Sequence, residues 1–252
     1  RPAGGTLPVF ACSLPVDGLY RFALLTENKH PETSRDRRSS RAHRGAGKQG
    51  RRFPSLRRIG MSAVQRGVTV AIIKTDVVSA LLCEAIMTDS VNHHFKENRM
   101  GESDLCDWVE FFLQKAGIPC KTQSVRDRQR NVIGIVEGKD TSRILCFDAH
   151  LDTTTARGMS VHPFGAEEAD GHIFGRGACD SKGALAAMMA ALKTLFDQGE
   201  RPPQTVILAA TIDKEVGQAG IQKLLDSDLR PTLAVVGAPT DLGVARCSRG
   251  CT

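Results

Sequence analysis

The sequence has no apolar run that approaches 18 residues, so it offers no candidate for a membrane-spanning helix. Its eight cysteines are scattered, include no Cys-x-x-Cys pair, and form no compact framework of the kind found in small secreted domains. This pattern is typical of reduced thiols, and we therefore expect a cytoplasmic protein that does not contact a membrane. Hydrophobic residues make up 41% of the 252 residues, an ordinary share for a globular protein.

Residues 1–60 lack sustained periodicity and carry most of the positive charge. They hold 13 Lys and Arg against 4 Asp and Glu, a net charge of about +9, which leaves about −3 for the remainder of a chain with +6 in total. The run at 34–58, rich in arginine, glycine and serine, cannot bury enough apolar surface to offset its ordering entropy. We expect residues 1–60 to be a disordered basic tail.

The basic tail is open to four interpretations. Two are functional, a nucleic-acid-binding arm and an organelle transit peptide, and two are not, a solvated tail and sequence upstream of a natural start at Met61. Aromatic residues are not interleaved with the basic ones, which argues against a nucleic-acid partner.

Hydrophobic periodicity predicts helices and strands from residue 75 onward. The expected helices are 75–88, 103–116, 183–196 and 221–225, and the expected strands are 120–125, 131–137, 143–147, 205–210, 233–236 and 243–246. Thr75 or Asp76 is expected to cap the first helix, and Gly117 to end the second. The short apolar run at 144–147 is typical of a strand that is covered on both faces.

Polar side chains follow two of the predicted strands. His150 and Asp152 come after one strand, and Asp213 and Glu215 come after another. Asp180 lies between them, where a glycine-rich turn meets a helix. In a parallel α/β sheet the strand ends carry the site, and one imidazole with several carboxylates from three separate segments suits a divalent metal. Alone, Asp180 would be interpreted as a helix N-cap, and His150 with Asp152 as a surface hydrogen bond.

Four segments carry a family resemblance: His150-Leu-Asp-Thr-Thr, the stretch 170–183, Asp213-Lys-Glu-Val-Gly and Val236-Gly-Ala-Pro-Thr. In their order and spacing, residues 80–250 resemble the N-terminal half of the catalytic domain in the acetylornithine deacetylase, succinyl-diaminopimelate desuccinylase, aminoacylase and glutamate carboxypeptidase family of metallohydrolases. The resemblance implies an α/β fold with a mostly parallel, mixed central sheet flanked by helices, as in zinc exopeptidases.

The same resemblance implies a function. The family uses a two-metal site holding Zn²⁺ or Co²⁺ to hydrolyse small N-acylated amino acids or peptides, in arginine or lysine biosynthesis among other roles. Residues 61–252 would then be a partial metallohydrolase catalytic domain. We expect it to stop before the family's lid or dimerisation domain, and a homodimer is expected only for full-length members.

By resemblance, His150, Asp180 and Glu215 are metal ligands, and Asp180 bridges two ions. Asp152 is a catalytic residue that holds the His150 imidazole in the correct tautomer without binding metal. Two positions depart from the family pattern. Lys214 stands where a glutamate is the general base, and Ala238 stands where an acidic residue binds metal. A final metal-binding histidine is expected beyond Thr252.

These departures predict an impaired metal-dependent hydrolase. Loss of a general base typically costs about 10²- to 10⁴-fold in rate. Two nearby divalent cations would lower the pKa of the Lys214 ammonium, which leaves open that it acts as a neutral base. The alternative is a degenerate, non-catalytic domain that binds a metal or a partner.

Several further residues are expected to have no role in catalysis. His93, His94, His162 and His172 are predicted to be loop histidines rather than ligands. Glu102 is interpreted as an acid that compensates the dipole of the helix that follows it.

Overall fold

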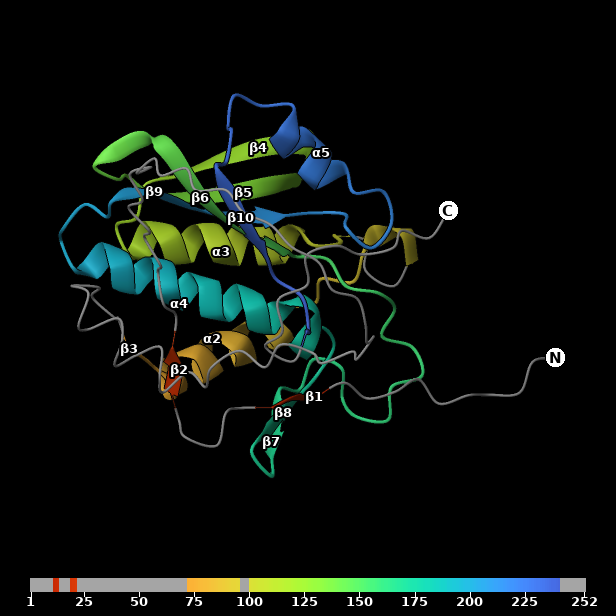
Figure 1. Ribbon diagram of the computed structural model, residues 1–252. Helices are drawn as coiled ribbons and strands as arrows, with labels where there is room; N and C mark the ends of the chain where they lie inside the picture. The colour runs from red at the N-terminus through yellow and green to blue at the C-terminus, as the bar shows by residue number, and fades with distance from the viewer. Residues whose placement is uncertain (1–10, 14–18, 22–71, 96–99, 241–252) are drawn as a thin grey trace, which may run out of the picture. The chain divides into compact units, whose positions relative to one another are not determined.

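The computed structural model describes residues 11–13, 19–21, 72–95 and 100–240 (Figure 1). The predicted basic tail lies almost entirely outside these residues, and the strand expected at 243–246 lies wholly outside them. The described residues from 72 to 240 belong to one compact unit.

A mixed five-stranded sheet forms the centre of this unit, with the strand order β10-β6-β9-β5-β4. The strands are β4 (Cys120–Arg126), β5 (Gln129–Val136), β6 (Asp140–His150), β9 (Gln204–Thr211) and β10 (Leu233–Val236). β10, β6 and β9 run parallel, whereas β5 pairs antiparallel with β9 and with β4. The predicted α/β fold with a mixed sheet is confirmed, and its parallel part consists of the strands that lead to the candidate site.

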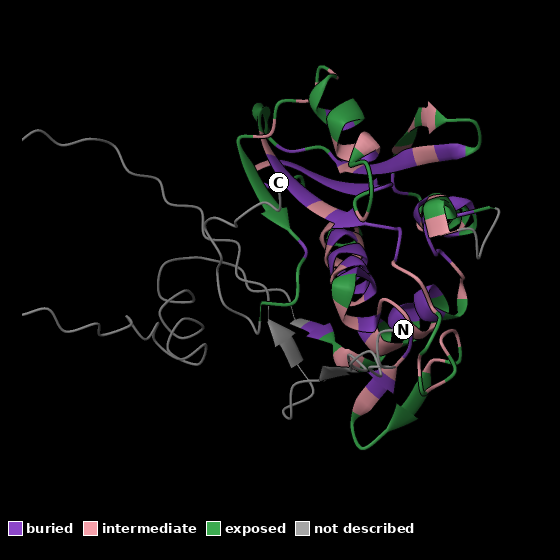
Figure 2. Ribbon diagram, turned by 90° about the vertical axis from the view of Figure 1, so that its right-hand side faces the viewer, coloured by how far each residue is buried: buried purple, intermediate pink, exposed green. Residues whose placement is uncertain are grey.

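Helices cover both faces of the sheet. They are α2 (Thr75–Met87), α3 (Ser103–Lys115), α4 (Gly183–Asp197) and α5 (Ala219–Leu225). α3 and α4 lie against one face with α2 beside α4, and α5 lies on the opposite face (Figure 1). Figure 2 shows the buried residues concentrated in the central strands and on the helix faces turned toward them.

The main core fills the space between the sheet and α2, α3 and α4. Gly134 of β5 allows this close packing, because a Cβ there would lie 2.8 Å from Leu113 of α3 and 3.1 Å from Leu192 of α4. A smaller core on the other face joins Ile133, Cys146 and Ile207 of the sheet to Leu224 of α5. Apolar burial on both faces explains why the central strands are almost continuously hydrophobic.

The helices and strands expected within the described residues are present, with differences at their ends. β6 extends to His150, so the candidate ligand is the last residue of the strand itself. Gly117 ends the second helix as predicted, with φ at 73°. The capping prediction was wrong: the N-cap of α2 is Lys74, with no side-chain hydrogen bond, and Asp76 instead accepts one from the N–H of Val77.

Several short elements were not predicted. They are β1 (Ala11–Ser13), β2 (Leu19–Arg21), β3 (Ile72–Lys74), β7 (Glu167–Ala169), β8 (His172–Phe174) and the one-turn helices η1 (His93–Phe95) and η2 (Ala178–Lys182). β7 and β8 form a hairpin that β1 joins, and β2 pairs with β3. Among the described residues, none of the helices has the length and apolarity to span a bilayer.

Candidate metal centre

The carboxyl ends of β6 and β9 lie side by side, with His150 opposite Thr211. Asp213 to Glu215 follow β9 directly, and the η2 turn supplies Asp180 to the same place. Three chain segments that are far apart in the sequence therefore meet at one edge of the sheet, where side chains of parallel α/β proteins form their sites.

His150, Asp180 and Glu215 form one cluster of potential metal ligands. One ligand atom from each lies within 4.8 Å of the other two. The Nε2 atom of His150 is 2.9 Å from Oδ1 of Asp180 and 3.8 Å from Oε1 of Glu215. The imidazole is only 5% exposed and the Glu215 side chain 16%, whereas the Asp180 carboxylate is 44% exposed and faces solvent.

This donor set fits a Zn²⁺ or Co²⁺ ion. Such ions bond imidazole nitrogen and carboxylate oxygen at about 2.0–2.2 Å, so the donors of one ion lie within about 4 Å of one another. The two separations from His150, 2.9 and 3.8 Å, satisfy this limit, and the donors of Asp180 and Glu215 lie within 4.8 Å of each other. Imidazole nitrogen and carboxylate oxygen are both zinc ligands, and three protein ligands leave a fourth position for water or substrate.

The ring of His150 is oriented for ligation through Nε2. Its Nδ1 atom donates a hydrogen bond of 2.9 Å to the backbone carbonyl of Asp152 and lies 3.5 Å from the carboxylate of the same residue. Burial disfavours the imidazolium, but the contacts with Asp152 and Asp180 outweigh it and raise the pKa of His150 to about 9. A metal ion must therefore displace a proton from Nε2 to bind there.

Asp152 is fully buried and supports more than the imidazole. Its carboxylate accepts hydrogen bonds of 2.9 Å from the backbone N–H groups of both Lys214 and Glu215. Burial raises the pKa of this carboxyl, but the hydrogen bonds from His150, Asn92 and Glu215 prevail and hold it below the usual value. Asp152 thus stays ionised and links the two strand ends that carry candidate ligands.

A buried polar network lies behind these residues, and the sequence singled out its members Asp213 and Glu102 without predicting their contacts. The side-chain amide of Asn92 donates to Asp152 at 2.9 Å and to Asp213 at 3.1 Å. Asp213 has φ at 64° and also accepts from Arg126 at 2.5 Å. The dipole interpretation of Glu102 was wrong, because its carboxylate is fully buried and accepts the N–H of Asp213 at 3.1 Å. This network fixes the turn that presents Glu215.

Lys214 points its ammonium group at two of the candidate ligands. Nζ lies 3.1 Å from Oε1 of Glu215 and 3.7 Å from Oδ2 of Asp180. Burial opposes its charge, but these carboxylates outweigh burial and raise the pKa of Lys214. The lowered pKa predicted from the sequence is an effect of two metal ions beside the lysine, and it stays a prediction.

Ala238 lies two residues beyond β10. Val236, the last residue of β10, is opposite Asp148 of β6, two residues before His150. Ala238 thus follows the end of a strand that pairs with β6, and its methyl group offers no ligand atom.

The remaining sequence interpretations concern the capping role of Asp180 and the loop histidines. The N-cap of α4 is Lys182, so Asp180 does not cap that helix. His93, His94, His162 and His172 are outside the His150 cluster, and their interpretation as non-ligands stays a prediction. His93 is nevertheless close to the buried network, 3.2 Å from the amide of Gln129.

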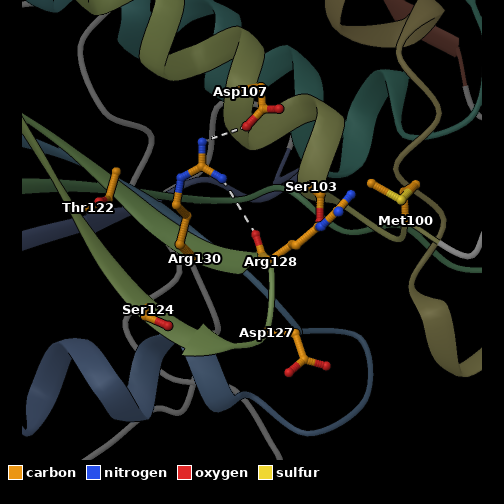
Figure 3. Close-up of a pocket in the computed structure, with 8 residues that line it drawn as sticks. All are labelled: Met100, Ser103, Asp107, Thr122, Ser124, Asp127, Arg128 and Arg130. Atoms are coloured by element: carbon orange, nitrogen blue, oxygen red, sulfur yellow. Dashed lines mark hydrogen bonds and ion pairs between the residues drawn. The ribbon is translucent and has the colours of Figure 1, made fainter.

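One cavity of the described residues lies apart from the candidate ligands. It has a volume of about 260 Å³ and lies between the start of α3 and the β4–β5 turn (Figure 3). Its lining includes Met100, Ser103, Arg128 and Arg130, and Arg130 is paired with Asp107 at its wall. We place the chemistry at the ligand cluster because that cluster has the matched donor atoms.

Comparison with known proteins agrees with this geometry. Residues 146–247 match the model of peptidase family M20/M25/M40, and this segment contains all three candidate ligands. A probable succinyl-diaminopimelate desuccinylase of Staphylococcus aureus is 27% identical over 170 residues, which cover 66% of this chain and 42% of that protein. A succinyl-diaminopimelate desuccinylase of Ruegeria pomeroyi is 35% identical over 143 residues, 53% of this chain and 37% of that protein.

Solved structures with the same fold include an M20 family metallo-carboxypeptidase from Sulfolobus solfataricus. It has a TM-score of 0.53 at 20% identity, covering 64% of this chain and 37% of its own. A tripeptidase from Staphylococcus aureus gives a TM-score of 0.52 at 20% identity, covering 65% of this chain and 43% of its own. The chain thus spans about two fifths of the length of the relatives it matches.

Proposed function

Because residues 146–247 belong to peptidase family M20/M25/M40, we propose that the cluster of His150, Asp180 and Glu215 is the metal site of an amide hydrolase. One observation supports this most strongly: three segments far apart in the chain bring an imidazole and two carboxylates within bonding reach of one ion. The ion would be Zn²⁺ or Co²⁺.

When bound, such an ion polarises a carbonyl oxygen and lowers the pKa of water. The chain's own residues would hold and orient it. His150 offers Nε2, with its ring fixed through the backbone carbonyl of Asp152. The partly exposed carboxylate of Asp180 is the donor that reaches solvent, so it lies on the side from which a substrate approaches.

The substrate class we propose is a small N-acylated amino acid or a short peptide. Two relatives are named for desuccinylation of succinyl-diaminopimelate, and one structural neighbour is named as a tripeptidase. A cytoplasmic location and a homodimer of the full-length protein are further parts of this proposal. Cys83, Cys106, Cys120 and Cys146 form no disulfide, which is compatible with that compartment.

We propose that hydrolysis is impaired in this chain. Lys214 replaces the carboxylate that would accept a proton, and its ammonium group is already engaged with Glu215 and Asp180. Ala238 removes one more ligand from the same edge of the sheet. These two residues also favour the second candidate function, a domain that binds metal without turning over substrate.

An amide-hydrolysis assay separates the two candidates. N-succinyl-diaminopimelate, N-acetylornithine and a tripeptide would be incubated with the protein in Zn²⁺ or Co²⁺, with Asp180→Ala as the inactive reference. Metal-dependent turnover that is absent in Asp180→Ala supports a working hydrolase. Metal binding at the same site with turnover no higher than in Asp180→Ala supports the non-catalytic function.

A further inference from the structure

The ammonium group of Lys214 lies among the carboxylates that are the candidate metal ligands. It donates a hydrogen bond of 3.1 Å to Oε1 of Glu215 and forms an ion pair of 3.7 Å with Oδ2 of Asp180. Asp180 and Glu215 are the two carboxylates of the His150 cluster. A positive charge that belongs to the protein therefore contacts two of the three side chains that would hold a divalent ion.

The backbone of Lys214 is fixed, so this placement follows from the fold. Its N–H bonds to the buried carboxylate of Asp152 at 2.9 Å, and Asp213 before it is locked by Asn92 and Arg126. The side chain itself is 47% exposed, which leaves it free to turn toward water when another cation arrives. Lys214 is thus positioned to approach both carboxylates and also to leave them.

We infer that Lys214 is a built-in cation of this site: its Nζ takes the place of a second metal ion, so the chain binds one divalent ion and does so in competition with the lysine. This inference rests on the proposed metal site. It adds that the site holds one ion per chain and that the lysine supplies the second positive charge. Asp213 cannot supply the missing negative charge, because its carboxylate is already paired with Arg126. Ala238 cannot supply a ligand either.

The charge of Lys214 determines whether its replacement strengthens or weakens metal binding. An ammonium about 4 Å from a divalent cation is repelled even in a water-like dielectric, and salt weakens this repulsion only in part at such a short distance. Removing the charge while keeping the length of the side chain should therefore raise metal affinity. We expect Lys214→Met to bind Zn²⁺ about tenfold more tightly than the unsubstituted chain.

The test is calorimetric titration of the whole chain with Zn²⁺ alone, counting as site-specific the binding that His150→Ala removes. Lys214→Met is compared with Lys214→Arg, which keeps the charge, and with Lys193→Met. Lys193 is an exposed lysine that pairs with Asp197 on α4, so its replacement controls for loss of a surface ion pair. Thermal melting of each variant shows that it is folded before it is titrated.

The expected result is one ion per chain, tighter binding in Lys214→Met, and affinities near that of the unsubstituted chain in Lys214→Arg and Lys193→Met. Two site-specific ions in the unsubstituted chain, or equal or weaker affinity in Lys214→Met, would overturn the inference and leave the metal site intact. Absence of site-specific binding in every variant would overturn both the inference and the proposed function.

Discussion

The carboxylate of Asp152 accepts a hydrogen bond of 2.9 Å from the backbone N–H of Glu215, and this contact joins the ends of two parallel strands. The carboxylate follows β6 and the N–H follows β9. Since the backbone carbonyl of Asp152 also holds the ring of His150, one residue sets the position of two candidate ligands that are remote in sequence.

Replacement of Asp152 by asparagine should therefore affect both binding and stability. The amide keeps one oxygen but loses the charge and one acceptor for the N–H groups of Lys214 and Glu215. We expect metal affinity to fall by about 10- to 100-fold and the free energy of unfolding by about 2–4 kcal/mol. Zinc titration and urea unfolding measure the two effects, and Asp197→Asn on the surface of α4 is the control. An unchanged affinity would contradict the supporting role.

Asn92 separates two buried carboxylates with a single amide group, which donates to both Asp152 and Asp213. Asn92→Ala removes the donor and should lower the free energy of unfolding by about 2–3 kcal/mol. Asn92→Asp places a third carboxylate in the same space and should be the more damaging change at neutral pH. Urea unfolding ranks the two variants against Gln114→Ala, an exposed control. The reverse order would show that Asn92 acts by shape alone.

Glu102 is expected to make the folded state less stable as the pH rises. Its burial, with the nearby charges of Asp152 and Asp213, raises its pKa from 4.5 to about 7. The folded state therefore binds the proton more tightly than the unfolded state, and stability falls as pH rises from about 4.5 to 7, by up to about 3 kcal/mol.

Urea unfolding at intervals between pH 5 and 8 tests this dependence. Glu102→Gln mimics the protonated form, so its stability should change less over that range than that of the unsubstituted chain. Glu137→Gln, which breaks an exposed pair with Arg201, should keep the original slope. If the free energy of unfolding changed with pH equally in the unsubstituted chain and in Glu102→Gln, Glu102 would not be the source of the pH dependence.

β10 presents an apolar edge within the described part of the chain. Leu233, Val235 and Val236 are all exposed, and the only strand β10 pairs with there is β6. Exposed apolar edge strands promote association between chains. Val235→Lys should therefore reduce self-association, measured by sedimentation at increasing concentration, whereas Lys193→Met on α4 should not. Equal association of the unsubstituted chain and Val235→Lys would contradict this expectation.

The sequence was sufficient to predict elements whose pattern is local. The apolar run at Leu233–Val236 was predicted to the residue, and Gly117 marked the end of α3. The residues at the ends of β6 and β9 were recognised because polar side chains follow apolar runs there. The β7–β8 hairpin was missed because strands of three residues are too short to show a period.

The supporting network was beyond sequence reasoning for a different reason. Asn92 and Glu102 contact Asp213 across 121 and 111 residues of chain. Hydrogen bonds between such distant residues leave no periodic trace, and each residue alone is compatible with a solvated loop or helix end. Likewise, the sequence showed Lys214 in the place of a base, but only the geometry shows that its ammonium contacts Glu215 and Asp180.

The central claim is that His150, Asp180 and Glu215 together bind one divalent ion. Its most direct test is the visible absorption spectrum of Co²⁺ added to the chain, compared with His150→Ala, Glu215→Gln and the control His172→Ala. Bound Co²⁺ with a spectrum of low coordination number, lost in the first two variants and kept in His172→Ala, is the result predicted here. A spectrum that persists in both His150→Ala and Glu215→Gln would contradict it.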